Sequence, residues 1–372
     1  MKIAGVRVYQ VNLGVRPEFV ITTSIGTHAI SKYVFLAIEG SDGAVGWGEA
    51  TVMPRWSGET QGGAACVLQQ LFEPLLRDRD PFDLDQIMQD INSSIVDNMF
   101  SKAAVEMALL DLLGKSQGLP VYKILGGSAN PKRIPIKFSI GVRDPEDAAR
   151  IARDKVDEGF TAIKVKVGPD QASDLLRVQQ VREAIGPGIK LNIDVNGGWS
   201  VKDAIRFIPQ YLPFNLEYVE QPTPRGDIDG LANVSKAIDV PIMADESVFT
   251  PEQATQVIRN RAADLISVYP GKNGGVLNSR LICKMAESAG IGCHIGSNLE
   301  SDIATSAMCH LAACTANIQV NRYPVDILGP LYYSTSLAKS PVRIDRGHAE
   351  VPEGPGFGLD IDERHIEKLS KC

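Results

Sequence analysis

Two lysines and three acidic residues stand where short apolar segments end, which is where buried strands would stop. Lys164 and Lys166 form the sequence KVK, and Asp194, Glu220 and Asp245 follow at spacings of roughly 24 to 28 residues. Strands that are buried on both faces should be almost wholly apolar. Charged groups in these places therefore indicate a site that holds a cation and moves a proton.

The two lysines share one face of their strand, because side chains at positions i and i+2 of a strand point the same way. Asp194 and Asn196 are related in the same manner. Two buried ammonium groups side by side are costly unless anions compensate them. Like-charge repulsion should lower the pKa of each lysine, so that a neutral amine becomes available as a general base near neutral pH.

The three carboxylates should repel one another unless a hard cation lies between them. Ligand sets made only of oxygen favour Mg²⁺ or Mn²⁺ over zinc. Any one of these acids taken alone would be an ordinary solvated loop residue. Three of them at successive strand ends, in a chain that also carries KVK, indicate a metal site.

The elements that would carry these residues begin near Ile134, where short apolar segments start to alternate with helical ones, as in repeated βα units. A parallel barrel brings the carboxyl ends of its strands to one mouth, where barrel enzymes hold their active sites. The alternative is an open doubly wound sheet, but no glycine-rich dinucleotide motif follows any strand. The segments that we expect to form strands are 134–142, 162–168, 190–196, 216–222, 241–247, 264–271, 292–298 and 317–321.

The part of the chain before residue 125 reads as strands followed by helices, which suggests an α+β domain. With 372 residues, the chain needs two domains or one large barrel. Its net charge of −7 and the lack of a dense Lys/Arg run argue against a nucleic-acid partner. No apolar run approaches the ~20 residues that span a bilayer, and the N-terminal segment lacks the features of a signal peptide. We therefore expect a cytoplasmic protein without membrane partners.

Several motifs resemble the muconate-lactonizing-enzyme subgroup of the enolase superfamily, over nearly the whole chain. They are KVK at 164–166, DVN at 194–196, VEQP at 219–222, ADES at 244–247, AAVEMALLDLLGKSQGLPVYKILGG at 103–127, KNGG at 272–275 and LGPL at 328–331. The resemblance implies an α+β capping domain at 1–125 and a modified (β/α)7β TIM-like barrel of the α/β class at 126–345. It also implies a C-terminal segment at 346–372 that returns to the capping domain, and we expect a homo-oligomer.

The same resemblance implies the chemistry of the site. Mg²⁺, or Mn²⁺, would lie on Asp194, Glu220 and Asp245, where it would hold a small-molecule carboxylate substrate and stabilise the enediolate. Lys166 would be the base on one face of the substrate, and Lys164 would tune it.

The chain departs from the subgroup on the sixth strand, where the pattern KxxxxGG would place a second lysine. Tyr269 takes that position in YPGKNGG, and Lys272 has the opposite strand parity. We expect Tyr269 to face the substrate, although a bend at Pro270 and Gly271 would let Lys272 turn inward. A packed barrel tyrosine is the remaining interpretation. A phenol, with a pKa near ~10, is better suited to donating a proton at pH 7 than to abstracting one.

A tyrosine at this position resembles the cis-3-hydroxy-L-proline dehydratases of the subgroup. In the cis isomer the 3-hydroxyl and the α-proton lie on opposite faces of the ring, so a base and an acid on opposite faces would be needed. The main hypothesis is a hydro-lyase of amino-acid catabolism that converts this substrate to Δ1-pyrroline-2-carboxylate, with Lys166 as the base. The alternative is a racemase, epimerase or cycloisomerase that uses Lys272 or Tyr269 as a second base.

Four further residues are candidates for substrate binding: Trp56, Asn196, Asn298 and Asp326. Trp56 lies in a loop that should close the mouth, where it would shield a small ring from water or simply pack. Asp326 would pair with a substrate ammonium or serve a structural role. Dipeptide epimerases carry the pattern DxD here, and Leu328 in the second position argues against a dipeptide substrate.

Overall fold

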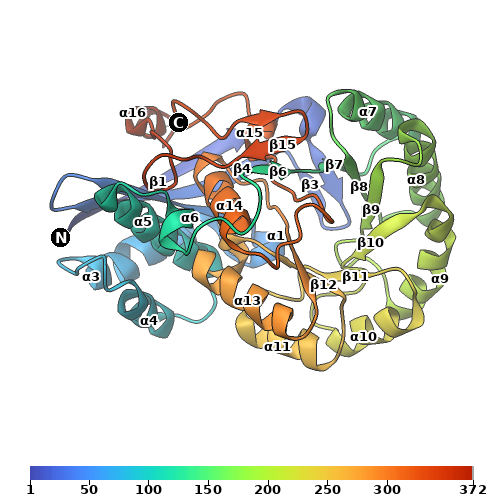
Figure 1. The fold of residues 1–372 in the computed structure, drawn as a ribbon, viewed down its shortest axis with the longest axis horizontal. Coiled ribbons are helices and arrows are strands. Elements are labelled where there is room, and N and C mark those ends of the chain that lie inside the picture. Colours follow the sequence, from blue (N-terminus) through green and yellow to red (C-terminus); the bar gives the residue numbers. More distant parts are fainter. Residues whose placement is uncertain (371–372) are drawn as a thin grey trace.

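The computed structural model describes residues 1–370, so the last two residues of the segment predicted at 346–372 lie outside the described part. An α+β cap lies on the left of Figure 1, and a barrel of parallel strands ringed by helices lies on the right. Strand β1 (Ile3–Gly14) and helix α16 (Glu363–Ser370), from opposite ends of the chain, both belong to the cap side. The predicted fold class is confirmed.

The cap is built on an antiparallel sheet in which β4 (Ile30–Gly40) pairs with β1 on one side and β5 (Val45–Val52) on the other. Helix α5 (Met99–Gln117) packs across this sheet and is buried along most of its length. Gly48 permits the close approach, because a Cβ there would lie 1.8 Å from the carbonyl oxygen of Ala104. The smaller cap elements are a 3₁₀ turn (Pro17–Phe19), β2 (Ile21–Thr23), β3 (Gly26–His28), α1 (Pro54–Ser57), α2 (Gln61–Cys66), a π-helical stretch (Val67–Phe72), α3 (Glu73–Leu76), α4 (Leu84–Ser94) and α6 (Val121–Ile124).

Seven parallel strands form the barrel and neighbour one another in chain order. They are β7 (Phe138–Ile140), β8 (Ala162–Lys166), β9 (Lys190–Asp194), β10 (Leu216–Glu220), β11 (Ile242–Ala244), β12 (Leu265–Val268) and β13 (Gly292–Ile295). The helices of the barrel are α7 (Pro145–Asp157), α8 (Gln171–Ile185), α9 (Val201–Tyr211), α10 (Ile228–Ala237), α11 (Pro251–Arg259), α12 (Pro270–Asn273), α13 (Val276–Ser288) and α14 (Asp302–Cys314), with a 3₁₀ turn at Leu212–Phe214.

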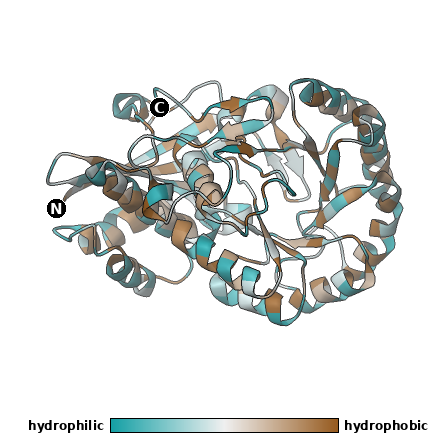
Figure 2. Ribbon diagram, viewed as in Figure 1, coloured by the Kyte–Doolittle hydropathy of each residue, from teal (hydrophilic) through white to brown (hydrophobic). Residues whose placement is uncertain are grey.

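Local chemistry explains why the outer helices start where they do. The side chains of Asp144, Asp170, Ser200, Asp227 and Thr250 each accept a hydrogen bond from a backbone N–H in the first turn of α7 to α11. Hydrophilic and hydrophobic residues alternate along the same helices (Figure 2), so that one side packs on the strands and the other meets solvent. Within residues 1–370, no helix combines the length and apolar character needed to cross a membrane.

A short extended segment closes the barrel in place of an eighth regular strand. Val325 N–H donates to Pro135 O at 3.0 Å, and Asp326 N–H donates to Ile295 O at 2.9 Å, which joins the two edges of the sheet. The strand predicted at 317–321 is wrong, because this segment forms turns and makes only an isolated bridge. The closing contacts lie a few residues later than predicted.

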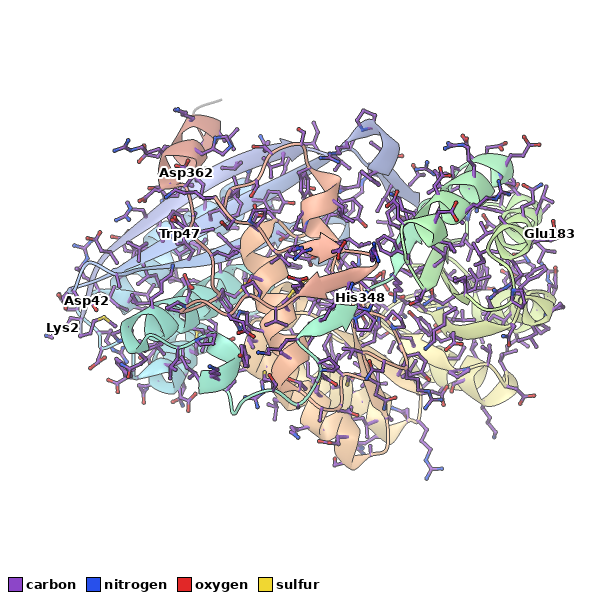
Figure 3. The ribbon with its side chains drawn as sticks, turned by 45° about the horizontal axis from the view of Figure 1, so that its top comes forward. Lys2, Asp42, Trp47, Glu183, His348 and Asp362 are labelled. Atoms are coloured by element: carbon purple, nitrogen blue, oxygen red, sulfur yellow. The ribbon has the colours of Figure 1, made fainter. Side chains whose placement is uncertain are left out.

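The C-terminal part of the chain crosses from the barrel to the cap. It contains α15 (Gly329–Tyr332), β14 (Ile344–Asp345) and β15 (His348–Glu350), and β15 also pairs with β6 (Arg133–Pro135). Helix α16 then packs on β1, where Arg7 Nε lies 2.7 Å from Glu363 Oε1. Figure 3 shows Asp362, just before this helix, on the same side of the molecule as Trp47 of the cap sheet.

Candidate active site

A cavity of about 510 Å³ lies at the mouth of the barrel, between the strand ends and two cap segments near residues 21–28 and 53–56. All ten residues that the sequence predicts for the site line this cavity. They are Trp56, Lys164, Lys166, Asp194, Asn196, Glu220, Asp245, Tyr269, Asn298 and Asp326. The structure thus brings the predicted residues together, while their roles stay predictions.

The two lysines of KVK both reach the cavity from the end of β8. Lys166 Nζ lies 2.5 Å from Asp194 Oδ2. Lys164 Nζ lies 2.8 Å from Asp326 Oδ2 and 3.2 Å from Glu220 Oε2. Each ammonium group is therefore paired with an acid from a different strand or from the closing segment.

The pKa of Lys164 differs from the prediction. Burial alone would lower it, but Asp326, Glu220 and Asp194 hold the pKa of Lys164 well above its ordinary value. The expected lowering by like-charge repulsion is wrong for this residue, because three carboxylates outweigh one neighbouring ammonium group.

The three acids predicted to bind metal lie at the ends of adjacent strands. Glu220 on β10 is in register with Asp194 on β9, and Asp245 directly follows β11. Burial and the Asp194 charge raise the pKa of Glu220 to about 8. Burial would raise the pKa of Asp194 as well, but Lys166 and Lys164 hold it below its ordinary value. Mutual repulsion and an all-oxygen donor set fit a hard cation such as Mg²⁺.

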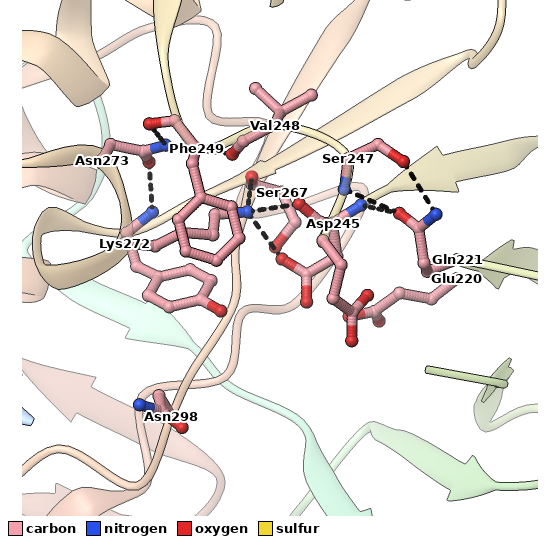
Figure 4. A network of polar contacts seen from close by, with 12 residues as sticks. Glu220, Gln221, Asp245, Ser247, Val248, Phe249, Ser267, Lys272, Asn273 and Asn298 are labelled. Atoms are coloured by element: carbon pink, nitrogen blue, oxygen red, sulfur yellow. Dashed lines mark hydrogen bonds and ion pairs between the residues drawn. The ribbon is translucent and has the colours of Figure 1, made fainter. Parts of the chain in front are cut away.

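The three acids are not arranged in metal-binding geometry in this structure. Among the described residues, no three His, Cys, Asp or Glu side chains are arranged to hold a metal ion. Each acid is turned toward a lysine instead, as Figure 4 shows for Asp245 and Lys272. The turn that carries Asp245 is held by Gln221, whose Oε1 accepts from the N–H groups of Asp245 at 2.9 Å and Ser247 at 3.2 Å. Sequence reasoning assigned no role to Gln221, although it lies within the motif VEQP.

Tyr269 and Lys272 have different surroundings. Lys272 is fully buried, and its Nζ donates to Asp245 Oδ1 at 2.6 Å, Asp245 O at 2.8 Å and Ser267 O at 2.7 Å (Figure 4). It is not among the residues that line the cavity, whereas Tyr269 is. The buried Tyr269 hydroxyl has no hydrogen-bond partner within residues 1–370. Burial, followed by the Asp245 charge, raises the pKa of Tyr269 well above its ordinary value. The geometry thus sets Tyr269, rather than Lys272, beside the space that a ligand would fill.

The cap reaches the site through Trp56. Its indole stacks on Tyr269, with ring centroids 5.6 Å apart and planes at 20°. Its Nε1–H donates to Glu246 Oε1 at 3.2 Å, and Asn196 Nδ2 donates to the same oxygen at 2.9 Å. Asn196 Oδ1 in turn accepts from Lys166 Nζ at 3.0 Å. Glu246 therefore links the cap loop to the lysine, a connection that its place in ADES did not reveal.

Asn298 ties one wall of the cavity to the cap. Its Nδ2 donates to Thr51 O at 2.9 Å, so this amide group is already engaged by the cap backbone. The next residue, Leu299, has a φ of 61°, a left-handed conformation that is uncommon for leucine. Tyr333 Oη donates to Leu299 O at 2.8 Å and helps to hold that conformation.

Asp326 lies between two lysines. Its Oδ2 is 2.8 Å from Lys164 Nζ and 3.3 Å from Lys137 Nζ. These ammonium groups hold the pKa of Asp326 below its ordinary value, although burial opposes them. Asp326 Oδ1 is buried and has no hydrogen-bond partner among the described residues.

Sequence reasoning missed Lys137. It lies just before β7, is fully buried, and also contacts the Tyr218 hydroxyl and His294 Nε2, the latter at 2.6 Å. Burial lowers the pKa of Lys137 to about 8, so it remains mostly protonated at neutral pH. The i, i+2 relation of Lys137 to Ser139 in IPIKFSI is the signal that could have found it. Three basic cap residues that line the cavity were also not predicted: His28, Lys32 and Arg55.

The chain matches two descriptions of protein families. Residues 3–126 match "Mandelate racemase / muconate lactonizing enzyme, N-terminal domain", and residues 147–365 match "Enolase C-terminal domain-like". Together the two matches cover most of the cap and most of the barrel.

Curated proteins with similar sequences include racemases, epimerases and cycloisomerases. The chain is 35% identical to an L-Ala-D/L-Glu epimerase of Bacillus subtilis over 340 residues, which is 91% of each protein. It is 34% identical to muconate cycloisomerase 1 of Rhodococcus opacus over 352 residues, 94% of this chain and 92% of the relative.

Solved structures give the same result. The B. subtilis epimerase with bound substrate superposes with a TM-score of 0.92 at 34% identity, over 96% of this chain and 99% of that one. A dipeptide epimerase of Enterococcus faecalis complexed with Mg and L-Leu-L-Tyr gives a TM-score of 0.91 at 31% identity, over 97% of this chain and all of that one. The names of these relatives support the broad resemblance stated above, and the finer resemblance to hydroxyproline dehydratases is not supported by them.

Proposed function

Because the chain belongs to the mandelate racemase / muconate lactonizing enzyme family of the enolase superfamily, we propose that it removes the α-proton of a small carboxylate substrate with Lys166 and eliminates water with the help of Tyr269. The proposed substrate is cis-3-hydroxy-L-proline, and the proposed product is Δ1-pyrroline-2-carboxylate. The family supports an enzyme that acts next to a carboxylate. The choice of a hydro-lyase rests on the site of this chain.

The position of Tyr269 across the mouth from Lys166 carries the proposal. Lys166 ends β8 and Tyr269 follows β12, and these strands stand four places apart in a ring of seven strands and one closing segment. Side chains from opposite sides of such a ring approach opposite faces of a ligand at its centre. One amine and one phenol suit the removal of a proton from one face and the protonation of a leaving group on the other.

The proposed elimination uses four residues of the chain. Lys166, as the neutral amine, takes the α-proton, and Tyr269 gives its hydroxyl proton to the 3-hydroxyl, which leaves as water. The enamine that results tautomerises to the cyclic imine. Asp326 Oδ1 would accept a hydrogen bond from the ring nitrogen, and Trp56 would keep water from the reacting ring.

Asp194, Glu220 and Asp245 are the residues that would hold Mg²⁺. When bound, this ion supplies positive charge for the substrate carboxylate and for the negative charge that develops beside it. The strand ends that present these acids follow directly on β8, which presents Lys166, so a carboxylate held there would have its α-carbon near the lysine.

A second candidate is an epimerase, racemase or cycloisomerase, since the relatives compared above carry those names. Tyr269 would then act as the second base, or Lys272 would have to leave its three oxygen partners. A dipeptide substrate is disfavoured, because Leu328 is buried and offers no second acid to the cavity.

A substrate comparison in D₂O tests the proposal. The purified protein with Mg²⁺ would be incubated in parallel with cis-3-hydroxy-L-proline, L-proline, an N-acylamino acid and L-Ala-L-Glu, and followed by proton NMR. We expect loss of water from the hydroxyproline and no racemisation of L-proline. Epimerisation of the dipeptide or the N-acylamino acid, with the hydroxyproline left intact, would instead support the second candidate.

A further inference from the structure

Lys137 is a buried cation for which the proposed reaction has no use. Its Nζ contacts the Tyr218 hydroxyl, His294 Nε2 at 2.6 Å and Asp326 Oδ2 at 3.3 Å. A fully buried ammonium group is costly unless its partners compensate it. Of these partners, only Asp326 lines the cavity.

We infer that Lys137 is a positioning residue that fixes Asp326 so that one carboxylate oxygen stays free for the N–H of an amino-acid substrate. The inference rests on the proposed function only in taking an amine-bearing substrate. It assigns to Lys137 a part in substrate selection, exerted through Asp326.

The two oxygens of Asp326 are used differently. Oδ2 lies within ion-pair distance of both Lys164, at 2.8 Å, and Lys137, at 3.3 Å. Oδ1 has no partner in the described part of the chain, although it is buried. A buried oxygen without a partner is unfavourable, and a donor from a bound ligand would remove that penalty.

Two lysines fix the orientation of the Asp326 carboxylate, which one lysine alone would not do. Lys164 comes from the end of β8, and Lys137 comes from the segment before β7, so they reach Oδ2 from two neighbouring elements. With Lys164 alone, the carboxylate could turn and offer either oxygen to that lysine. Lys137 removes this freedom, which keeps Oδ1 available at the cavity.

The test compares two unreactive ligands that differ in the ring N–H. L-Proline and cyclopentanecarboxylate share a five-membered ring and a carboxylate, and their affinities for the Mg²⁺-loaded protein are measured by calorimetry. The wild type should prefer L-proline. Lys137→Met keeps the length of the side chain but removes its charge, and it should weaken L-proline binding about tenfold or more, the equivalent of one charge-assisted hydrogen bond. Cyclopentanecarboxylate should bind as before.

Further variants separate positioning from a structural defect. Asp326→Asn should lose the same preference, and the double variant should lose no more than Asp326→Asn alone, because both changes act through one group. Tyr218→Phe removes one partner of Lys137 and should also reduce the preference for L-proline. This variant keeps the inference testable if Lys137→Met does not fold. Lys339→Met, at an exposed lysine, is the control and should change nothing.

Several outcomes would overturn the inference. The wild type would show no preference for L-proline, or Lys137→Met would lose affinity for both ligands equally, or the losses of L-proline affinity would add in the double variant. A protein that shows the expected preferences but does not dehydrate cis-3-hydroxy-L-proline would overturn the proposed function and leave the inference standing.

Discussion

At the scale of single residues, lysine side chains compensate the negative charges of the cavity acids. Each of the four cavity carboxylates lies within ion-pair distance of at least one ammonium group. Lys164 alone contacts three of them, whereas Lys166 contacts only Asp194. Lys166, with fewer partners to release, is therefore the better placed of the two to act as a base.

The first prediction concerns this base. Lys166→Ala should lose exchange of the substrate α-proton with solvent deuterium, together with turnover, because the amine that takes the proton is gone. Loss of a general base costs roughly 10²–10⁴-fold. Proton NMR in D₂O measures both rates. Lys202→Ala, at an exposed lysine of α9, is the control and should behave as the wild type. Undiminished exchange in Lys166→Ala would assign the base to another residue.

The second prediction concerns Lys164, whose pKa the surrounding carboxylates hold above its ordinary value. Three carboxylates contact Lys164 and compensate its charge across the working range, so it acts as a fixed cation that holds those carboxylates in place. Lys164→Ala should therefore reduce kcat/KM by the same factor between pH 6 and about 9. A loss at pH 7 that recovers at high pH would show instead that Lys164 tunes its neighbour, as the sequence suggested.

Strand parity predicted part of this residue-level arrangement. It predicted that Lys164 and Lys166 both face the cavity, because they stand at alternate positions where an apolar strand ends. Lys137 was missed, since a lone lysine beside a short strand looks like a surface residue. The link from Trp56 to Glu246 depends on how a cap loop folds over the barrel, and no spacing within the sequence encodes that contact.

At the scale of elements, acidic side chains of the cap join it to the barrel by accepting hydrogen bonds from the N-termini of barrel helices. Glu49 of β5 accepts from Ser301 N–H at 2.8 Å and Ala304 N–H at 3.0 Å at the start of α14. Glu106 of α5 accepts from Leu277 N–H at 3.0 Å at the start of α13. The first N–H groups of a helix have no partner within the helix, and the carboxyl oxygens of both acids accept from them, so both acids hold the cap against the barrel.

The third prediction uses Glu106, whose pKa burial raises from 4.5 to about 7. The folded protein binds this proton more tightly than the unfolded chain, so the contribution to stability is full below pH 4.5 and is lost as the pH rises to about 7. The free energy of unfolding of the wild type relative to Glu106→Gln should therefore fall by up to about 3 kcal/mol between pH 5 and 8. Urea denaturation at several pH values measures it.

Glu183→Gln is the matched control for this measurement, because Glu183 projects from the outer surface of α8 (Figure 3). Its difference from the wild type should not change with pH. A flat difference for Glu106→Gln as well would contradict a raised pKa at the junction of cap and barrel.

The sequence predicted most elements from the pattern of apolar residues, and the exception has a physical cause. The helices after Asp144 and Thr250 begin at the side chains that cap them, which a sequence reveals. The closing segment of the barrel makes only a few hydrogen bonds to either edge. Its position depends on where the two edges stand, so the sequence placed it a few residues too early.

The whole molecule places a lid made of cap loops over a mouth made of strand ends, and the site requires both. Sequence motifs predicted this arrangement because they resemble a family in which the acids and lysines recur on successive strands. They do not test the substrate that Tyr269 suggests, since part of the cavity wall comes from cap segments that carry no motif. Those walls include His28 and Arg55, for which the proposed reaction has no role.

The fourth prediction is the loss of activity when the metal is removed. EDTA should abolish turnover and added Mg²⁺ should restore it. Asp194→Asn, Glu220→Gln and Asp245→Asn should each abolish turnover, and added Mg²⁺ should not restore it. The circular dichroism of these variants should match the wild type, because the acids lie at the rim of the barrel and not among its apolar layers. Full activity in chelator would contradict the assignment of these acids.

The most direct measurement of the central claim follows Tyr269→Phe in D₂O with cis-3-hydroxy-L-proline. Phenylalanine keeps the ring stacked on Trp56 but lacks the proton that the leaving hydroxyl requires. The account predicts that Lys166 still exchanges the α-proton while water loss falls by roughly 10²-fold or more. Loss of exchange and elimination together would make Tyr269 the proton-abstracting group. No change in either rate would make Tyr269 structural and contradict the account.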